Sequence, residues 1–465
     1  MINTKDKGPS LVLWVIAFVL FIVVFVSFCY GDTISIIRFE IGFAETIIKG
    51  EFKDLYRAAY DTALYAQENH LRGPHFPTYA LPLNLILGIW GIPLYLYRNF
   101  CGIHEDITQS FGQILYGKSI LLLALIITVI LVYKICCALG SKKHEAKWGA
   151  YLYFTSSIVT CSTGIIGQSD VIGMILILAG FLAYIRGQYK KFLIYFIIAM
   201  PFKMYAFFLM FPLMLLQEKN IVRIIRNLVF IAVPMLLFDL SQISNPVALR
   251  TKTFFNLTIF KRLSAHMLPL FHGQASVFVV LLGILCVYCY LHDKRSEEEK
   301  NFALFISIAS GVILFTSFNT YPYWMIYLAP YLAVACVCCA DKANIILFET
   351  SGFAAVAFSN YLRSAHMYDI HNTVNMFLHR LFGNPEFREG ALTINKLAQS
   401  KLILGTIRVS DAVFIVCMFT IVYLCSPARN NNTHSVNYRQ CAVTRLVINT
   451  LIAYIPVILF FNAIR

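Results

Sequence analysis

Long apolar runs alternate with short polar stretches along the whole chain. Three clear runs extend from Leu11 to Phe28, from Ile120 to Tyr133 and from Phe302 to Phe318. Each approaches the ~20 residues that an α-helix needs to cross a hydrocarbon layer ~30 Å thick. Because backbone polar groups inside a bilayer must be paired within the segment, this pattern predicts an all-α, polytopic membrane protein.

The composition agrees with this fold class. Hydrophobic residues make up 59% of the 465 residues and charged residues only 13%, about half the roughly 25% of soluble domains. This balance excludes secreted enzymes, nucleic-acid modules and cytosolic cofactor folds. The 38 basic and 24 acidic residues therefore indicate membrane topology and anionic lipid. The thirteen cysteines lie mostly in apolar runs, so no disulfide framework is predicted.

Short basic loops are expected to face the cytoplasm. The first apolar run is longer than a signal-peptide core, so we interpret it as an uncleaved first helix with a cytoplasmic N-terminus. The other predicted cytoplasmic loops are Ser141 to Lys147, Arg186 to Lys191, Gln217 to Arg226, His292 to Asn301, Asp341 to Lys342 and Pro427 to Arg445.

Two segments must depart from regular crossings if every basic loop is to lie on one side. Phe76 to Tyr97 is rich in proline and glycine, so it is predicted to lie on the outer face as a juxtamembrane or re-entrant element. Between Lys191 and Gln217 the chain must go out and return within a short distance. Pro201 and Lys203 mark the break, which predicts two short half-helices that meet near Lys203.

With these two corrections the chain is expected to form one membrane domain, residues 1–465, with about 13 transmembrane helices. Juxtamembrane helices are expected in the first outer loop, where apolar residues from Ile36 to Lys49 recur at helical spacing. The C-terminus would lie outside. The long outer loops would be Tyr30 to Gln113, Ser241 to Gln274 and Asn360 to Lys401.

Unusual polar groups gather at the predicted outer ends of the helices. Two carboxylates, a lysine inside an apolar stretch and a basic loop on one face would form a site for a phosphate-bearing amphiphile. The candidate catalytic residues are Asp32 and Asp170. The candidate substrate-binding residues are Arg38, His75, Gln168, Lys203, Arg250, Lys252, Arg262, Tyr321 and Tyr323.

Each of these residues also has a purely structural explanation. Asp32 and Asp170 could cap helices, and Lys203 could extend its ammonium to the outer headgroups. Tyr321, Tyr323 and Trp324 could belong to an interfacial aromatic belt, and the basic loop residues could touch lipid phosphates. The chain has no dinucleotide fingerprint of the form Gly-x-Gly-x-x-Gly and no His-Glu-x-x-His motif.

Several motifs, taken in order, resemble the GT-C superfamily of integral-membrane glycosyltransferases. They are the aspartate of the first outer loop, the segment Pro74-His75-Phe76-Pro77-Thr78-Tyr79, the turn Gly167-Gln168-Ser169-Asp170, and the hairpin Pro-Phe-Lys-x-x-Ala-x-x-x-x-x-Pro-Leu that begins at Pro201. The resemblance covers about Leu11 to Leu216. Residues 1–216 are therefore expected to be a GT-C-like catalytic module, and 217–465 a variable helical half with outer loops 241–274 and 360–401.

The resemblance implies a polyprenyl-phosphate sugar donor and an inverting displacement on the outer or lumenal face. It also implies that Asp32 is the general base and that Asp170 is a second acidic residue of the site. The chain lacks the paired Asp-Glu that follows the first helix in this superfamily, and it lacks a large soluble C-terminal domain. A divalent metal is therefore a candidate cofactor without a firm ligand set, and a protein acceptor is not implied.

We therefore expect a hexosyltransferase that uses no nucleic acid and transfers sugar to a cell-surface glycan, lipid or polymer. It would lie in a bacterial plasma membrane or the endoplasmic reticulum, in contact with membrane lipids. A flippase or transporter of lipid-linked sugars is the alternative, although such proteins tend to show repeated halves and ionisable groups at the bilayer midplane. A noncatalytic assembly partner is the third interpretation.

Overall fold

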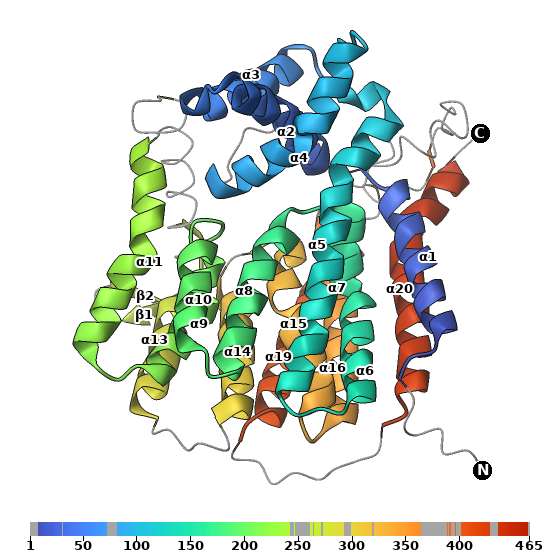
Figure 1. The fold of residues 1–465 in the computed structure, drawn as a ribbon. Helices are drawn as coiled ribbons and strands as arrows, with labels where there is room; N and C mark the ends of the chain where they lie inside the picture. The colour runs from blue at the N-terminus through green and yellow to red at the C-terminus, as the bar shows by residue number, and fades with distance from the viewer. Residues whose placement is uncertain are drawn as a thin grey trace.

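A bundle of apolar helices makes up most of the molecule, and α2 (Gly31–Lys49), α3 (Leu55–Glu68) and α4 (Leu81–Phe100) lie across one end of it (Figure 1). The computed structural model describes residues 8–29, 31–71, 81–241, 246, 261–263, 265–270, 273–292, 299–318, 320–363, 388, 390, 391, 396, 401–427 and 436–463.

The first half of the chain supplies the three end helices and the centre of the bundle. In chain order its helices are α1 (Leu11–Ser27), α2 (Gly31–Lys49), α3 (Leu55–Glu68), α4 (Leu81–Phe100), α5 (Phe111–Ala138), α6 (Lys143–Phe154), α7 (Ser157–Val159), α8 (Asp170–Ile185), α9 (Tyr189–Ala199) and α10 (Tyr205–Gln217). A π-helix, Thr160–Ile166, and two short 3₁₀ helices, Phe52–Asp54 and Ile107–Gln109, connect them.

The second half completes the bundle and adds a small hairpin. Strands β1 (Met267–Leu270) and β2 (Gly273–Ser276) are antiparallel, with Met267 opposite Ser276. The remaining elements are α11 (Ile221–Ser241), α13 (Val277–Leu291), α14 (Glu299–Ser317), the 3₁₀ helix Pro322–Tyr327, α15 (Ala329–Cys338), α16 (Lys342–Arg363), α19 (Lys401–Leu424) and α20 (Tyr438–Ala463).

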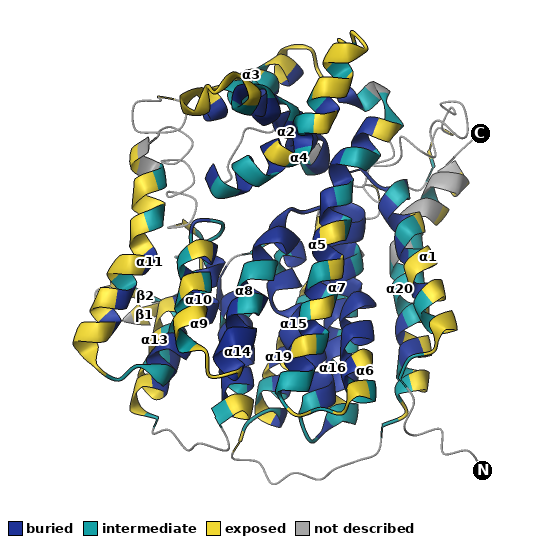
Figure 2. Ribbon diagram, in the orientation of Figure 1, coloured by how far each residue is buried: buried dark blue, intermediate teal, exposed yellow. Residues whose placement is uncertain are grey.

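The protein is an all-α, multi-pass membrane protein. Among the described residues, α5, α11, α14, α16 and α19 are long and apolar enough to cross a membrane, and several shorter apolar helices pack beside them. Figure 2 shows buried residues on α14 and α16 and exposed residues along α1 and α11. Many of these exposed residues are large and apolar, as expected for helices that face lipid. The number of about 13 crossings stays a prediction.

The segment that was predicted not to cross, Phe76 to Tyr97, corresponds largely to α4 among the end helices. α4 packs along α2 and is not among the described helices that are long and apolar enough to span. Glycine allows this contact, because a Cβ atom on Gly91 would lie only 2.4 Å from the carbonyl oxygen of Glu40. The close approach joins α4 to α2 at the end of the bundle.

The predicted break near Lys203 is also present. α9 ends at Ala199, two residues before Pro201, and α10 begins at Tyr205. With 11 and 13 residues, the two helices are about 16 Å and 20 Å long at 1.5 Å per residue. Their connection lies at the end of the bundle that faces α2 and α3 (Figure 1).

Several connections with basic residues gather at the opposite end of the bundle. α1 begins at this end, and the connections between α5 and α6, α8 and α9, α10 and α11, and α15 and α16 lie there too (Figure 1). They belong to four of the six loops that were predicted to share one side. The other two, His292 to Asn301 and Pro427 to Arg445, lie partly outside the described residues.

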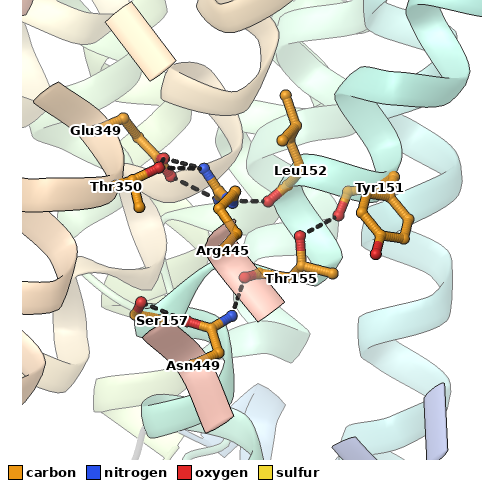
Figure 3. Close-up of polar contacts among 8 residues, drawn as sticks. All are labelled: Tyr151, Leu152, Thr155, Ser157, Glu349, Thr350, Arg445 and Asn449. Atoms are coloured by element: carbon orange, nitrogen blue, oxygen red, sulfur yellow. Dashed lines mark hydrogen bonds and ion pairs between the residues drawn. The ribbon is translucent and has the colours of Figure 1, made fainter. Parts of the chain in front are cut away.

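A buried polar network joins the C-terminal helix to the bundle (Figure 3). Arg445 of α20 makes an ion pair with Glu349 of α16, and its Nη2 donates to the backbone oxygen of Leu152 over 2.6 Å. Asn449, one turn further along α20, donates to the backbone oxygen of Thr155 and accepts a hydrogen bond from Ser157. All thirteen cysteines are free thiols.

Candidate active site at one end of the bundle

Asp170 is the centre of a charged cluster at the end of the bundle that faces α2. It is the first residue of α8 and is only 2% exposed. Its Oδ1 lies 2.5 Å from Lys203 Nζ and accepts a hydrogen bond from the Tyr327 hydroxyl over 3.2 Å. Its Oδ2 is buried without a hydrogen-bond partner in the described part of the chain. Oδ1 thus accepts two hydrogen bonds, whereas Oδ2 accepts none from the described residues.

The backbone before Asp170 makes a sharp turn that only glycine accommodates. The π-helix ends at Ile166, and the next residue, Gly167, has a φ of +68°, which lies in the left-handed region. A Cβ atom there would lie 2.4 Å from Thr33 Oγ1. The Thr33 hydroxyl donates to the backbone oxygen of Ile166 over 2.6 Å. The turn is therefore held against the beginning of α2 by close contact.

Asp32 meets the same turn from the other side. It lies in the first turn of α2 and is partly exposed. The Nε2 of Gln168 donates a hydrogen bond to Asp32 Oδ2 over 2.9 Å. Because Gln168 precedes Asp170 by two residues, the two candidate carboxylates flank one short segment of backbone.

Lys203 lies between a carboxylate and aromatic rings. Its Nζ is 4.6 Å from the ring centroid of Trp324 and 5.5 Å from that of Tyr205. An ammonium over an aromatic face is attracted by the ring quadrupole. The side chain is 13% exposed, so the charge is largely removed from water. Asp170 accepts from one of the three N–H groups of the ammonium.

Arg262 brings a second cation to the same aromatic side chains. Its guanidinium carbon lies 4.6 Å from the Trp324 ring centroid and 4.9 Å from that of Tyr321. Tyr321 stacks on Tyr323 with ring centroids 5.3 Å apart, and Tyr321 is 41% exposed. Trp324 thus contacts both cations of the cluster, and an exposed ring borders it.

The structure brings most of the predicted site residues together and places one in a different contact. The cluster contains Asp32, Gln168, Asp170, Lys203, Arg262, Tyr321 and Tyr323. Arg38 instead points to Asp106, with Nε 2.8 Å from Oδ2 and Nη2 3.0 Å from Oδ1. His75, Arg250 and Lys252 lie outside the described residues.

The Arg38–Asp106 pair is a well-formed bidentate ion pair within the end helices. Burial alone would raise the pKa of Asp106, but hydrogen bonds from Arg38 and Thr108 outweigh this effect and lower the pKa from 3.8. The pair therefore fixes the connection between α4 and α5 against α2.

Two residues of the cluster escaped the interpretation of the sequence. Tyr327 contributes the second hydrogen bond to Asp170, but in sequence it is one aromatic among many. Trp324 was assigned to an interfacial belt, although its ring lies against Lys203 and Arg262. The spacing of Trp324 and Tyr327 by three residues, which places both on one side of a helix, was the available signal.

Among the described residues, no group of three or more His, Cys, Asp or Glu side chains is placed to hold an ion. A divalent metal remains a predicted candidate and no more.

Neither comparison with known proteins gives a relative. No model of a known protein family matches the chain, and no curated protein matches its sequence. Function must therefore be inferred from the residues of the site.

Proposed function

We propose that this protein is a GT-C-type glycosyltransferase that transfers a sugar from a polyprenyl-phosphate donor to a surface glycan, lipid or polymer. The observation that carries the proposal is the Gln168–Asp170 turn, which binds Asp32 through Gln168 and Lys203 through Asp170. A partly exposed carboxylate lies on one side of the turn, and a carboxylate that holds a lysine lies on the other. Attack on a sugar phosphate needs both a base and a fixed cation.

Asp32 would be the general base. The acceptor hydroxyl loses its proton to the Asp32 carboxylate as its oxygen attacks the anomeric carbon. The bond from that carbon to the phosphate oxygen breaks, and polyprenyl phosphate leaves with the bonding electrons. The attack from the opposite side inverts the anomeric centre. The hydrogen bond from Gln168 to Oδ2 orients the carboxylate.

Lys203 and Arg262 would stabilise the phosphate that leaves. Hydrogen bonds from cationic donors to phosphate oxygens are short and strong, and they gain strength where water is excluded. Asp170 and Trp324 hold Lys203 in place, with N–H groups left to donate to a phosphate. The exposed face of Tyr321 offers a surface for the sugar ring.

The location of the cluster fits a donor that is anchored in the membrane. It lies at the end of an apolar bundle, where a lipid phosphate would meet an aqueous acceptor. If the basic connections at the other end are cytoplasmic, the N-terminus is also cytoplasmic and the cluster is on the outer or lumenal side. The substrate site of a transporter is expected near the middle of the membrane, whereas this cluster lies at one end of the bundle.

The test is transfer by the purified protein in lipid nanodiscs. Polyprenyl-phosphate hexoses would be supplied with glycan and lipid acceptor extracts, and release of polyprenyl phosphate would be measured by mass spectrometry. We expect release with at least one donor and a loss of at least ~10²-fold in Asp32→Asn, the low end for general-base catalysis. Asp61→Asn, which changes an exposed acid on α3, should keep the parental rate.

Two results would contradict the proposal. Equal rates for Asp32→Asn and the parental protein would show that Asp32 is only a helix-terminal residue. Movement of intact donor across a proteoliposome membrane, without cleavage of the sugar–phosphate bond, would instead identify a flippase.

A further inference from the structure

Lys118 is a lysine of α5 whose side chain is enclosed in the protein. It is 2% exposed, and its Nζ lies 2.5 Å from the backbone oxygen of Phe25, 2.7 Å from that of Phe28 and 3.3 Å from that of Gly164. The ammonium is also 4.2 Å from the Phe25 ring centroid. An ionisable group inside a membrane bundle is costly and is usually functional.

The three oxygens come from places where the backbone lacks a helical partner. α1 ends at Ser27, so the carbonyl of Phe25 belongs to its last turn and that of Phe28 lies just beyond. Gly164 lies near the end of the π-helix, whose carbonyls require a partner five residues ahead, beyond its last residue. One ammonium, with three N–H groups, satisfies all three oxygens.

Both segments held by Lys118 lead directly to the candidate site. Asp32 follows Phe28 by four residues, and Gln168 follows Gly164 by four residues. Gln168 and Asp32 are the pair joined by the 2.9 Å hydrogen bond. Lys118 therefore binds the beginning of two short segments: the Asp32 arm, from Phe28 to Asp32, and the Gln168 arm, from Gly164 to Gln168. These arms bring the proposed general base and the amide that orients it together.

We propose that Lys118 is a positioning residue that fixes the Asp32 arm to the Gln168 arm and so sets the orientation of the general base. The expected effect on turnover rests on the proposed function. The expected loosening of the two arms does not, because it depends only on the contacts of Lys118. Lys118 acts through Asp32 and Gln168 and touches no substrate. Misplacement of a reacting group by about 1 Å can cost ~10²-fold in rate.

The experiment compares four proteins in nanodiscs: the parent, Lys118→Met, Lys118→Arg and Lys134→Met. Methionine keeps most of the side-chain length without the donors, and arginine keeps charge and donors. Lys134 is an exposed residue of the same helix and provides the matched control. Amide hydrogen exchange is measured over the whole chain, and kcat and KM are measured with a polyprenyl-phosphate hexose that the parent uses.

We expect Lys118→Met to exchange at least about 10-fold faster in peptides covering residues 25–37 and 160–170, and to change little elsewhere. Its kcat should fall about 10²-fold while the donor KM stays within about twofold, because the donor contacts are untouched. Lys118→Arg should recover most of both losses, and Lys134→Met should match the parent.

Faster exchange spread evenly over the chain would overturn the proposal, because Lys118 would then be a general stabilising residue. Unchanged exchange in the two arms would overturn it as well. If the parent transfers sugar from no donor, the proposed function fails, but the exchange measurement still decides whether Lys118 joins the arms. A normal kcat together with loosened arms would show that this geometry does not control turnover and would also refute the proposal.

Discussion

Gln168 and Asp32 are 136 residues apart in sequence, yet the Gln168 amide donates to the Asp32 carboxylate over 2.9 Å. The amide side is held by its own backbone, since the Gln168 N–H donates to the Ser162 oxygen over 3.0 Å. The carboxylate side is tied down by Thr33, whose hydroxyl binds the Ile166 oxygen. The hydrogen bond therefore joins two segments that are already in contact.

The first prediction follows from this pairing. Gln168→Leu removes the donor but keeps an apolar body of similar size, so kcat should fall by about 10-fold or more as Asp32 loses its orientation. Because the amide acts through the carboxylate, the two losses should not add. The double variant Gln168→Leu/Asp32→Asn should be as slow as Asp32→Asn alone, in a donor-release assay. Additive losses would show that Gln168 acts independently of Asp32.

The second prediction concerns the phosphate side of the site. Lys203→Met should raise the donor KM and lower kcat, each by about 10-fold or more, because a charge-assisted contact to phosphate is lost. Lys203→Arg should lose less. Lys190→Met, which removes an exposed lysine at the opposite end of the bundle, is the control for net charge. Steady-state kinetics with varied donor distinguish these cases, and unchanged constants in Lys203→Met would leave Lys203 as a structural lysine.

A third prediction concerns pH and Glu40 of α2. Glu40 is fully buried, and neither carboxyl oxygen has a hydrogen-bond partner in the described part of the chain. Burial raises the pKa of Glu40 well above the usual 4.5. The unfolded chain therefore releases this proton at lower pH than the native protein, so stability falls as the pH rises from about 4.5 towards the native pKa.

The slope from this single group is at most about 1.4 kcal/mol per pH unit. Glu40→Gln cannot ionise and should remove this part of the slope, which thermal unfolding midpoints at several pH values would show. Glu68→Gln, at an exposed position of α3, should keep the parental profile. Parallel pH profiles for Glu40→Gln and the parent would mean that Glu40 is ionised in the folded protein.

The fourth prediction tests which end of the bundle faces outward. In a variant without native cysteines, Ile89→Cys on α4 and Lys143→Cys at the start of α6 should be labelled from opposite sides of the membrane. Gly88 is a poor position for this test, since a Cβ atom there would lie 2.6 Å from Ile47. Ile89 is 60% exposed and avoids the clash. Labelling of Lys143→Cys from outside would reverse the proposed orientation.

The sequence predicted features that depend on local chemistry. α9 ends two residues before Pro201, which lacks the backbone N–H that a helix interior uses, and α4 combines two glycines with two prolines. Contacts between residues that lie far apart in the sequence could not be predicted from it. Nothing near Arg38 in sequence indicates Asp106, and nothing near Lys118 indicates the carbonyls of α1. An isolated charge such as Lys118 inside an apolar run was the one available sign of such a contact.

The site illustrates the same limit. Asp32, Asp170 and Lys203 stood out because charges are rare at helix ends that border apolar runs. Tyr327 and Trp324 did not, because their roles depend on which helices pack beside them. Arg262 was one of several basic residues in its loop, and only the fold shows that it lies over Trp324.

The buried pair of Glu349 and Arg445 has a consequence for how the protein is made. The two residues are 96 positions apart, so α16 leaves the ribosome well before α20. Removal of one partner from a buried pair costs about 3–5 kcal/mol. Arg445→Met should therefore reduce the amount of protein that accumulates, and Glu349→Leu/Arg445→Met should restore part of it, as quantitative blotting would show. Docking of α20 then acts as a checkpoint of biogenesis: until Arg445 arrives, the nascent bundle carries an unpaired buried acid that weakens it and exposes it to quality-control proteases.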